Sequence, residues 1–228
     1  MVGIRCYGAY IPKYRLGKET SGWGFPLEKA IGNFDEDSIT MAVAAGMDCL
    51  DGQDRDRVSS LFFATTAPPY LEKQGAALVA TALDLKRETF TADVTATLRA
   101  GTTALRLAAD AIASGSARDA LVAAGDVRMA APRSDLDRSL GDGGAALLLS
   151  STDTIAEIVG SHAVSEHILD VWRPAGEPFL RSWEERFVTE EGYLRIMGDA
   201  VAAALQKYKL APGDIAKAVY TALDPRRH

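Results

Sequence analysis

The sequence has few cysteines and lacks long uncharged apolar runs. Its two cysteines, Cys6 and Cys49, do not have the spacing of a disulfide framework or a zinc site. Both stand in apolar stretches, so we expect small core residues in a reduced, cytoplasmic compartment. Residues 1–16 contain three basic residues and lack the apolar core of a signal peptide. No window approaches the roughly 18 uncharged apolar residues of a membrane span, so no membrane association is expected.

The sequence also lacks blocks of like charge and nucleotide-binding glycine motifs. Its formal net charge is -6 and its pI is about 5.2, which argues against a nucleic-acid partner. Gly3 and Gly8 are too far apart for a dinucleotide loop, and no glycine-rich loop ends in Gly-Lys-Ser/Thr. What remains is ordinary globular composition, 47% hydrophobic and 25% charged over 228 residues. A chain of this length needs no disulfide or metal to stabilise its core.

Strands and helices alternate over the first 125 residues. A helix over residues 39–50 begins after a cap at Asp37 or Ser38, and the helix over 100–114 ends at Gly115. This order predicts an α/β fold of parallel βαβ units with helices on both faces. The expected strands are 2–11, 59–64, 89–94 and 120–124; the other expected helix is 75–85, and 18–33 is expected to be a loop.

The alternation stops after Gly125. The polar segment 129–140 and the segment 166–187 read as loops, and 189–208 has the periodicity of an amphipathic helix. The short connection between 143–149 and 154–164 predicts an antiparallel hairpin. A Pro-Gly-Asp turn at 212–214 should lead to a last strand over 215–222.

Five segments, in this order, resemble one family. They are residues 8–15, 33–41, 142–149, 170–174 (Asp-Val-Trp-Arg-Pro) and 192–195 (Gly-Tyr-Leu-Arg). Together they resemble the thiolase superfamily, and within it proteins similar to 3-hydroxy-3-methylglutaryl-CoA synthase. The resemblance covers nearly the whole chain.

The resemblance implies a layered αβαβα fold of two related halves with the active site between them. Residues 1–165 would form the N-terminal half and 166–228 the start of an incomplete C-terminal half. The implied activity is that of an acyltransferase of lipid metabolism, with a coenzyme A thioester as substrate and no metal or other cofactor. The implied assembly is a homodimer, or a heteromer with a thiolase-type or zinc-ribbon/OB-fold partner. Either assembly would pair through the strand over 89–94.

The family's catalytic groups are missing from the matching positions. Residues 93–102 align without a gap to the nucleophile segment and place Leu98 where the family has cysteine. Thr66 stands at the place of the family's glutamate and Thr221 at the place of its histidine. Three losses with intact flanks argue against acyl transfer through a cysteine.

The candidate pocket residues are Thr66, Thr97, Leu98, Arg99, Asp142, Gly143 and Thr221. Arg99 would meet a CoA phosphate or a carboxylate, or form a structural ion pair with Asp93 or Asp142. The hydroxyls of Thr66, Thr95 and Thr97 would bind a substrate carbonyl or satisfy backbone groups at strand ends. His162, Glu166 and His167 are a local cluster of metal-ligand types without a second ligand pair, so we expect no metal there.

Three functions stay open at this point. The first is a cysteine-free enzyme that binds acyl-CoA, for which retro-aldol chemistry would suit because it needs a base and an oxyanion hole but no thiol. The second is a non-catalytic subunit of a thiolase and OB-fold complex; the third is a working synthase.

We also expect the 228 residues to be marginally stable alone, or to depend on a partner. An early stop of the second sheet would expose Val219 of the last strand, together with Val201, Leu205 and Tyr208 of the preceding helix.

Overall fold

A computed structural model describes residues 1–20 and 22–221 and divides the chain into two compact units. The first unit contains Met1–Arg128 and Leu140–Val159, and the second contains Met129–Ser139 and Gly160–His228. The first unit therefore includes most of the predicted N-terminal half.

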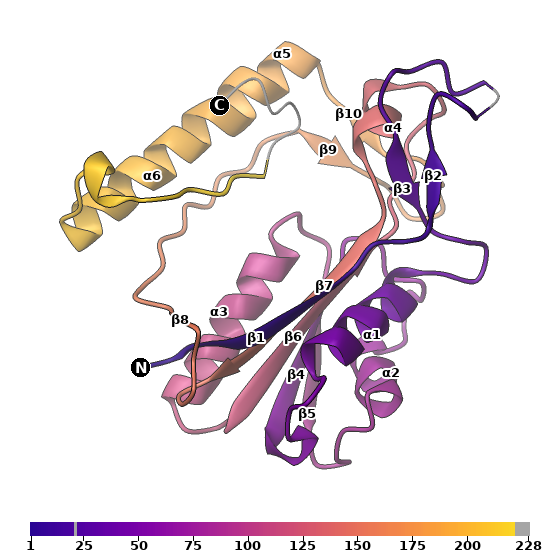
Figure 1. Ribbon diagram of the computed structural model, residues 1–228. Helices are drawn as coiled ribbons and strands as arrows, with labels where there is room; N and C mark the ends of the chain where they lie inside the picture. Colours follow the sequence, from indigo (N-terminus) through magenta and orange to yellow (C-terminus); the bar gives the residue numbers. More distant parts are fainter. Residues whose placement is uncertain (21, 222–228) are drawn as a thin grey trace. The chain divides into compact units, whose positions relative to one another are not determined.

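The first unit is built on a six-stranded mixed sheet with the order β5-β4-β6-β7-β1-β8 (Figure 1). β4 pairs in parallel with β5 and β6, whereas β7 is antiparallel to β6 and β1, and β8 is antiparallel to β1. It follows that β1, β4, β5 and β6 run in one direction, which confirms the predicted α/β fold. The strands are β1 (Gly3–Tyr10), β4 (Val58–Ala64), β5 (Phe90–Val94), β6 (Asp119–Asp126), β7 (Gly143–Ser150) and β8 (Ala156–Glu157).

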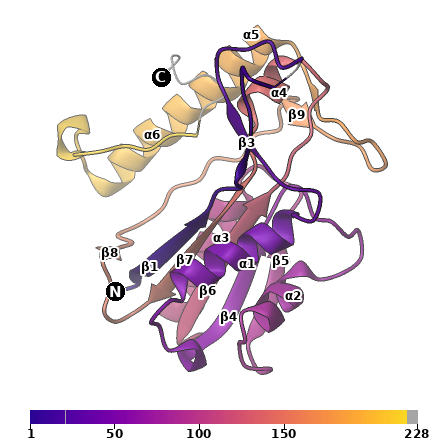
Figure 2. The ribbon, with the colours of Figure 1, turned by 45° about the vertical axis from the view of Figure 1, so that its right-hand side comes forward.

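Helices cover both faces of this sheet, as Figure 2 shows. α1 (Ser38–Cys49) and α2 (Gly75–Ala82) pack on one face, and α3 (Ala100–Ala113) packs on the other. The alternation of side chains along β4 serves both layers, since Leu61 and Phe63 join the core under α1 and α2, and Phe62 and Ala64 join the core under α3. The two cores together are made largely of alanine, leucine and valine, and they hold the sheet between its helices.

Three glycines allow α1 to lie directly on the sheet. A Cβ atom on Gly8 of β1 would approach the Ala45 carbonyl oxygen to 2.3 Å, and one on Gly125 of β6 would approach the Ser38 carbonyl oxygen to 2.1 Å. Gly144 of β7 is equally tight, with the Met41 carbonyl oxygen 2.4 Å away. Because no side chain fits at these points, the track of glycines fixes α1 against the sheet.

The predicted cap of α1 is confirmed. The Asp37 carboxylate accepts a hydrogen bond of 2.8 Å from the Thr40 backbone N–H, and the Asp37 N–H donates to the Thr40 hydroxyl at 2.7 Å. This reciprocal arrangement is a capping box, which satisfies N–H groups that have no partner inside the helix.

The second unit consists of short elements and one long helical segment. β9 (Val171–Trp172) and β10 (Arg181–Ser182) form an antiparallel pair. α5 (Glu185–Phe187) continues through a π-helical stretch (Val188–Leu194) into α6 (Arg195–Tyr208), whose residues are half-buried or exposed. The unit also contains α4 (Asp135–Ser139) and a 3₁₀ turn (Pro212–Asp214). In the described part of the chain, no helix has both the length and the apolar character required to cross a membrane.

Several expected elements are corrected by the structure. β8 does not form a hairpin with β7; it pairs with β1, because β1 presents a free edge beside the turn at Asp153, where φ is +53°. The expected strand over 215–222 is absent over its described residues, 215–221, and Val219 is 98% exposed there, with no neighbouring strand to pair with.

The predicted loops also contain regular structure. β2 (Tyr14–Leu16) and β3 (Lys29–Ile31) form an antiparallel pair whose second strand lies in the expected loop 18–33. The expected loops 129–140 and 166–187 contain α4 and the β9–β10 pair. These elements are two to five residues long, and so short a stretch shows no periodicity in a sequence.

Candidate functional site

Six of the seven predicted pocket residues lie at one edge of the sheet. The parallel strands β4, β5 and β6 end together, since Ala64 is opposite Val94 of β5 and Ala124 of β6. Gly143 begins β7 opposite Asp126, which places the 142–143 turn at this same edge. The six residues are Thr66, Thr97, Leu98, Arg99, Asp142 and Gly143. Thr221 is in the second unit, exposed and outside regular structure.

Leu98 stands on the turn that leads from β5 into α3. The turn begins with Ala96 at a positive φ of 61°, an unusual conformation for a residue with a Cβ atom. The Thr97 carbonyl accepts from the Ala100 N–H at 3.1 Å, and the Thr97 hydroxyl accepts from the Arg99 N–H at 3.2 Å. The side chain of Leu98 is 54% exposed. A helix N-terminus favours negative charge and would lower the pKa of a thiol at this place, but leucine has no group to ionise.

Thr66 is held by a carboxylate that the sequence reasoning did not identify. Oδ1 of Asp126 accepts from the Thr66 N–H at 2.7 Å and from the Thr66 hydroxyl at 3.1 Å. The same oxygen accepts from the Thr65 hydroxyl at 2.8 Å and from the Ala67 N–H at 3.1 Å. Asp126 therefore orients the whole turn after β4. The sequence did contain a signal for Asp126, since it follows a predicted parallel strand. The carboxyl ends of parallel strands meet at one edge of a sheet, where functional side chains gather.

Asp93 and Asp142, the expected ion-pair partners of Arg99, both bind backbone N–H groups. The Asp93 carboxylate accepts from Gly75 at 2.7 Å and from Ala76 at 2.6 Å, so it caps α2 from a neighbouring strand. The Asp142 carboxylate accepts from Gly32 at 2.8 Å and from the backbone of Arg128. The Asp142 contacts thus join its own loop to the loops that contain Gly32 and Arg128.

Gly143, the next candidate, is tightly placed. A Cβ atom there would lie 3.3 Å from the Tyr10 carbonyl oxygen at the end of β1. A side chain there would require the Tyr10 backbone to shift by a few tenths of an ångström, so close packing favours glycine at this position.

Asp142 is expected to make stability depend on pH in a specific way. Burial raises the pKa of the Asp142 carboxyl above its ordinary value of 3.8, and the Gly32 N–H and Lys29 oppose this rise. The folded protein thus binds the proton more tightly than the unfolded chain does. The contribution of Asp142 to the free energy of unfolding is therefore greatest below about pH 4 and falls as the pH rises through the folded pKa.

Asp142→Asn tests this sign, because asparagine keeps an acceptor for the Gly32 N–H and does not titrate. Urea unfolding at several values between about pH 4 and pH 7 should show the wild type losing stability relative to Asp142→Asn as the pH rises. Parallel stability curves for the two proteins would contradict the raised pKa.

The His162, Glu166 and His167 cluster is not arranged around a common centre. Glu166 forms an ion pair with Arg195, with one contact of 3.1 Å, and Arg195 lowers the pKa of the Glu166 carboxyl. Among residues 1–20 and 22–221, no three His, Cys, Asp or Glu side chains are grouped to hold a metal ion.

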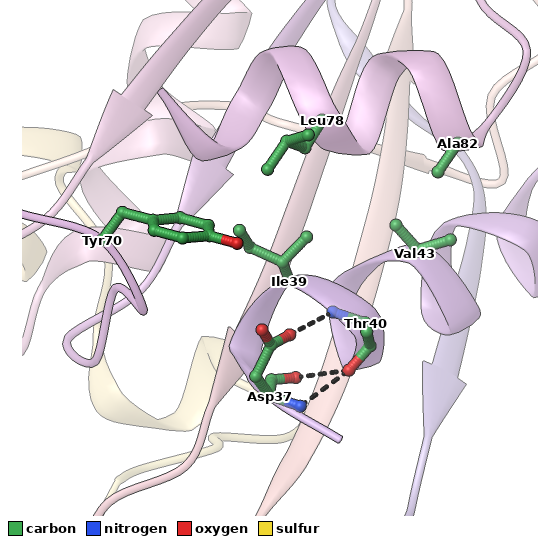
Figure 3. Close-up of a pocket in the computed structure, with 7 residues that line it drawn as sticks. All are labelled: Asp37, Ile39, Thr40, Val43, Tyr70, Leu78 and Ala82. Atoms are coloured by element: carbon green, nitrogen blue, oxygen red, sulfur yellow. Dashed lines mark hydrogen bonds between the residues drawn. The ribbon is translucent and has the colours of Figure 1, made fainter. Parts of the chain in front are cut away.

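A pocket of about 370 Å³ lies between α1 and α2, away from Leu98. Figure 3 shows the Tyr70 ring reaching toward Ile39, beside the capping box of Asp37 and Thr40. The rest of the lining is aliphatic and comes from Val43, Leu78 and Ala82. None of the predicted site residues contributes to it.

Comparison with known sequences identifies the family. The family described as 3-oxoacyl-[acyl-carrier-protein (ACP)] synthase III matches residues 92–167, which include the turn with Leu98. The hydroxymethylglutaryl-CoA synthase of Pyrococcus furiosus is 32% identical over 96% of this chain, and the chain spans 65% of its length. That of Methanocella arvoryzae is 30% identical over 96% of this chain, with 67% of its own length covered.

Solved structures agree on the fold. MvaS in complex with 3-hydroxy-3-methylglutaryl coenzyme A gives a TM-score of 0.80 at 24% identity, over 92% of this chain and 55% of that chain. A variant of Xanthomonas campestris OleA gives 0.84 at 17% identity, over 99% and 77%. These structures share the layered α/β fold, and the sequence matches place the chain in the thiolase superfamily. Within that superfamily, the chain belongs to the hydroxymethylglutaryl-CoA synthase family, and the predicted resemblance is confirmed.

Proposed function

We propose that this protein binds an acyl-CoA at the edge defined by Thr66, Leu98 and Asp142 and does not carry out acyl transfer through a cysteine. The observation that carries the proposal is Leu98, which occupies the turn before α3 with its side chain 54% exposed. Neither an aliphatic side chain nor the hydroxyl of Thr66, engaged by Asp126, supplies the thiolate that an acyl-enzyme requires.

The two cysteines of the chain are unsuited to replace the missing nucleophile. Cys49 belongs to the core between the sheet and α1, and Cys6 packs against that core, whereas α3 lies on the opposite face of the sheet. Burial raises the pKa of both thiols, so little thiolate forms at neutral pH. A nucleophile must reach the turn before α3, and the sheet separates both sulfur atoms from it.

The ligand class is proposed from the relatives and from the residues at the edge. The solved structures include complexes with 3-hydroxy-3-methylglutaryl coenzyme A and with CoA. At the carboxyl ends of the parallel strands, Thr66 lies in the turn after β4 and Thr97 in the turn after β5 that also carries Leu98. Arg99 of the same turn carries a positive charge suited to a phosphate or a carboxylate. We therefore propose a coenzyme A thioester as the ligand.

Incubation with acetyl-CoA tests the proposal directly. The intact mass of the protein should be unchanged, whereas isothermal titration should detect binding of the thioester. A stable mass gain of about 42 Da, one acetyl group, located at this edge would refute the claim that no acyl-enzyme forms. Absence of acetyl-CoA binding at millimolar concentration would refute the ligand assignment independently.

A role as a subunit of a complex is the second candidate, and the place of β5 as an edge strand of the six-stranded sheet favours it. The Val94 carbonyl accepts from the Thr65 N–H next to β4, whereas the Thr91 carbonyl accepts from the Gln74 side chain. Backbone groups alternate along a strand, so those of Thr91 and Asp93 face away from β4. Such an edge can extend the sheet into a second copy, a thiolase-type partner or a zinc-ribbon/OB-fold protein.

Two substitutions at Thr91 separate edge pairing from other modes of assembly. Thr91→Pro removes the outward N–H and should weaken association at micromolar concentration by at least tenfold, while Thr91→Val keeps the N–H and should associate like the wild type. Sedimentation equilibrium measures both variants. A wild-type protein that is monomeric, alone and with candidate partners, would contradict pairing through β5.

A further inference from the structure

The two cysteines of the chain contact each other across the interface between β1 and α1. Their sulfur atoms are 3.7 Å apart, although the residues are 43 positions apart in the sequence. The Cys6 thiol also donates a hydrogen bond of 3.0 Å to the Cys49 carbonyl oxygen. Cysteine is rare here, with two in 228 residues, and both are at this contact.

The two sulfur atoms need only a short approach to form a covalent link. A disulfide needs about 2.05 Å between the sulfur atoms, so the two, 3.7 Å apart, must approach by about 1.7 Å. The chain segments pack closely beside this contact, since a Cβ atom on Gly8, two residues after Cys6 on the same strand, would lie 2.9 Å from the Cys49 Cα atom. The register of β1 also shifts between Ile4 and Cys6, an irregularity of the kind that bends a strand.

We infer that Cys6 and Cys49 are an oxidisable pair, which a hydroperoxide converts into a disulfide that fastens α1 to β1. Cys6 is half-buried and Cys49 is 2% exposed, so peroxide reaches the Cys6 sulfur first. The Cys6 thiolate attacks the peroxide and becomes a sulfenic acid. Cys49 then attacks that sulfur and displaces water. In total, two thiols and one hydrogen peroxide give one disulfide and two molecules of water.

The surroundings determine how fast the pair reacts. Burial raises the pKa of the Cys6 thiol; Arg5 opposes this effect, and Asp119 adds to it. Burial and the neighbouring Cys6 raise the pKa of Cys49, and Asp48 adds to this rise. Oxidation is therefore slower than for an ordinary exposed thiol at neutral pH and becomes faster as the pH increases.

The link would act on a helix that reaches the candidate edge. Cys49 is the last residue of α1, and Ser38, its first, donates a hydrogen bond of 2.8 Å to the Ala67 carbonyl oxygen. Ala67 belongs to the turn that Asp126 holds together with Thr66. The inference concerns the fold and does not depend on the proposed function.

The test is mass spectrometry of the full chain after treatment with hydrogen peroxide. The intact mass should fall by about 2 Da, and peptide mapping should show Cys6 joined to Cys49. The melting temperature should rise by about 5 °C and return to its starting value after reduction with dithiothreitol. Cys49→Ala should instead gain oxygen at Cys6, with no rise in melting temperature.

Three results would overturn the inference. They are retention of both free thiols after prolonged oxidation at about pH 8.5, linkage of cysteines between chains, or a sulfinic acid at Cys6 in the wild type in place of the disulfide. The Cys6→Ser variant provides a second check, because it removes the peroxide-accessible sulfur and leaves the core residue Cys49 in place.

Discussion

Asp119→Ala is expected to lower the free energy of unfolding by about 3 kcal/mol or more. Asp119 begins β6 and is 1% exposed. Its carboxylate forms ion pairs of 2.9 Å with both Arg5 and Arg57, and it accepts from the Ser150 hydroxyl at 2.8 Å. Alanine would remove this acceptor from both guanidinium groups and from the Ser150 hydroxyl, which is fully buried. Arg5 would keep its ion pair with Asp153, so the cost comes from the loss of all three contacts together.

Asp153→Asn is the matched control for this prediction, because asparagine removes the charge and tolerates the positive φ of 53° at this residue. Asp153 pairs with the same Arg5 at 2.6 Å, but its carboxylate is 82% exposed. An exposed pair contributes little, so this variant should change the free energy of unfolding by less than about 1 kcal/mol. Urea unfolding of both variants gives the comparison. A similar loss of stability in the two variants would show that burial of Asp119 does not determine its contribution.

The Asp119 cluster illustrates what the sequence could and could not predict. The strand over 120–124 followed from its apolar residues, but the partners of Asp119 are 114 and 62 residues away along the chain. No local pattern joins residues at such separations. The same limit applies to β8, which could have paired with β7 and pairs with β1.

Local signals were reliable where an element is long and carries its own end signals. The cap was predicted at Asp37 or Ser38 and is at Asp37, and the glycine after α3 was predicted at Gly115, where φ is +78°. The segment 215–221 has the apolar residues of a strand but finds no partner strand, and its expected regular structure is absent. Composition alone therefore overestimates strands near the end of the described chain.

In the candidate site, too, local features could be predicted from the sequence and long-range contacts could not. The aligned segment 93–102 placed Leu98 on the turn before α3, because the turn and the start of the helix are encoded locally. The role of Asp126 could not be predicted, because its hydrogen-bond partners are in the turn after β4, 59 to 61 residues away along the chain. Asp93 was considered only as one of two ion-pair partners for Arg99, and its role at the N-terminus of α2 was not predicted, because that helix begins 18 residues before it in the sequence.

Leu98→Cys should give the protein a reactive thiol at the turn that we propose as the counterpart of the family's nucleophile position. The new side chain would replace one that is 54% exposed, at the turn before the first residue of α3. The positive end of the helix dipole stabilises a thiolate there. The two native thiols are in the core on the other face of the sheet, and their raised pKa values keep them slow to react. Alkylation should therefore occur at one added site.

Leu107→Cys is the matched control, because Leu107 is on the same helix, is 44% exposed and is far from its N-terminus. Reaction with iodoacetamide at about pH 7 should be roughly tenfold faster at residue 98 than at residue 107, which corresponds to a pKa lowered by about one unit. After incubation with acetyl-CoA, intact mass should show an acetyl adduct on Leu98→Cys and none on Leu107→Cys.

Equal alkylation rates at the two positions would mean that the turn does not activate a thiol. An acetyl adduct on neither variant, despite the faster alkylation at residue 98, would mean that the edge no longer positions a thioester, and the proposed acyl-CoA ligand would then be wrong.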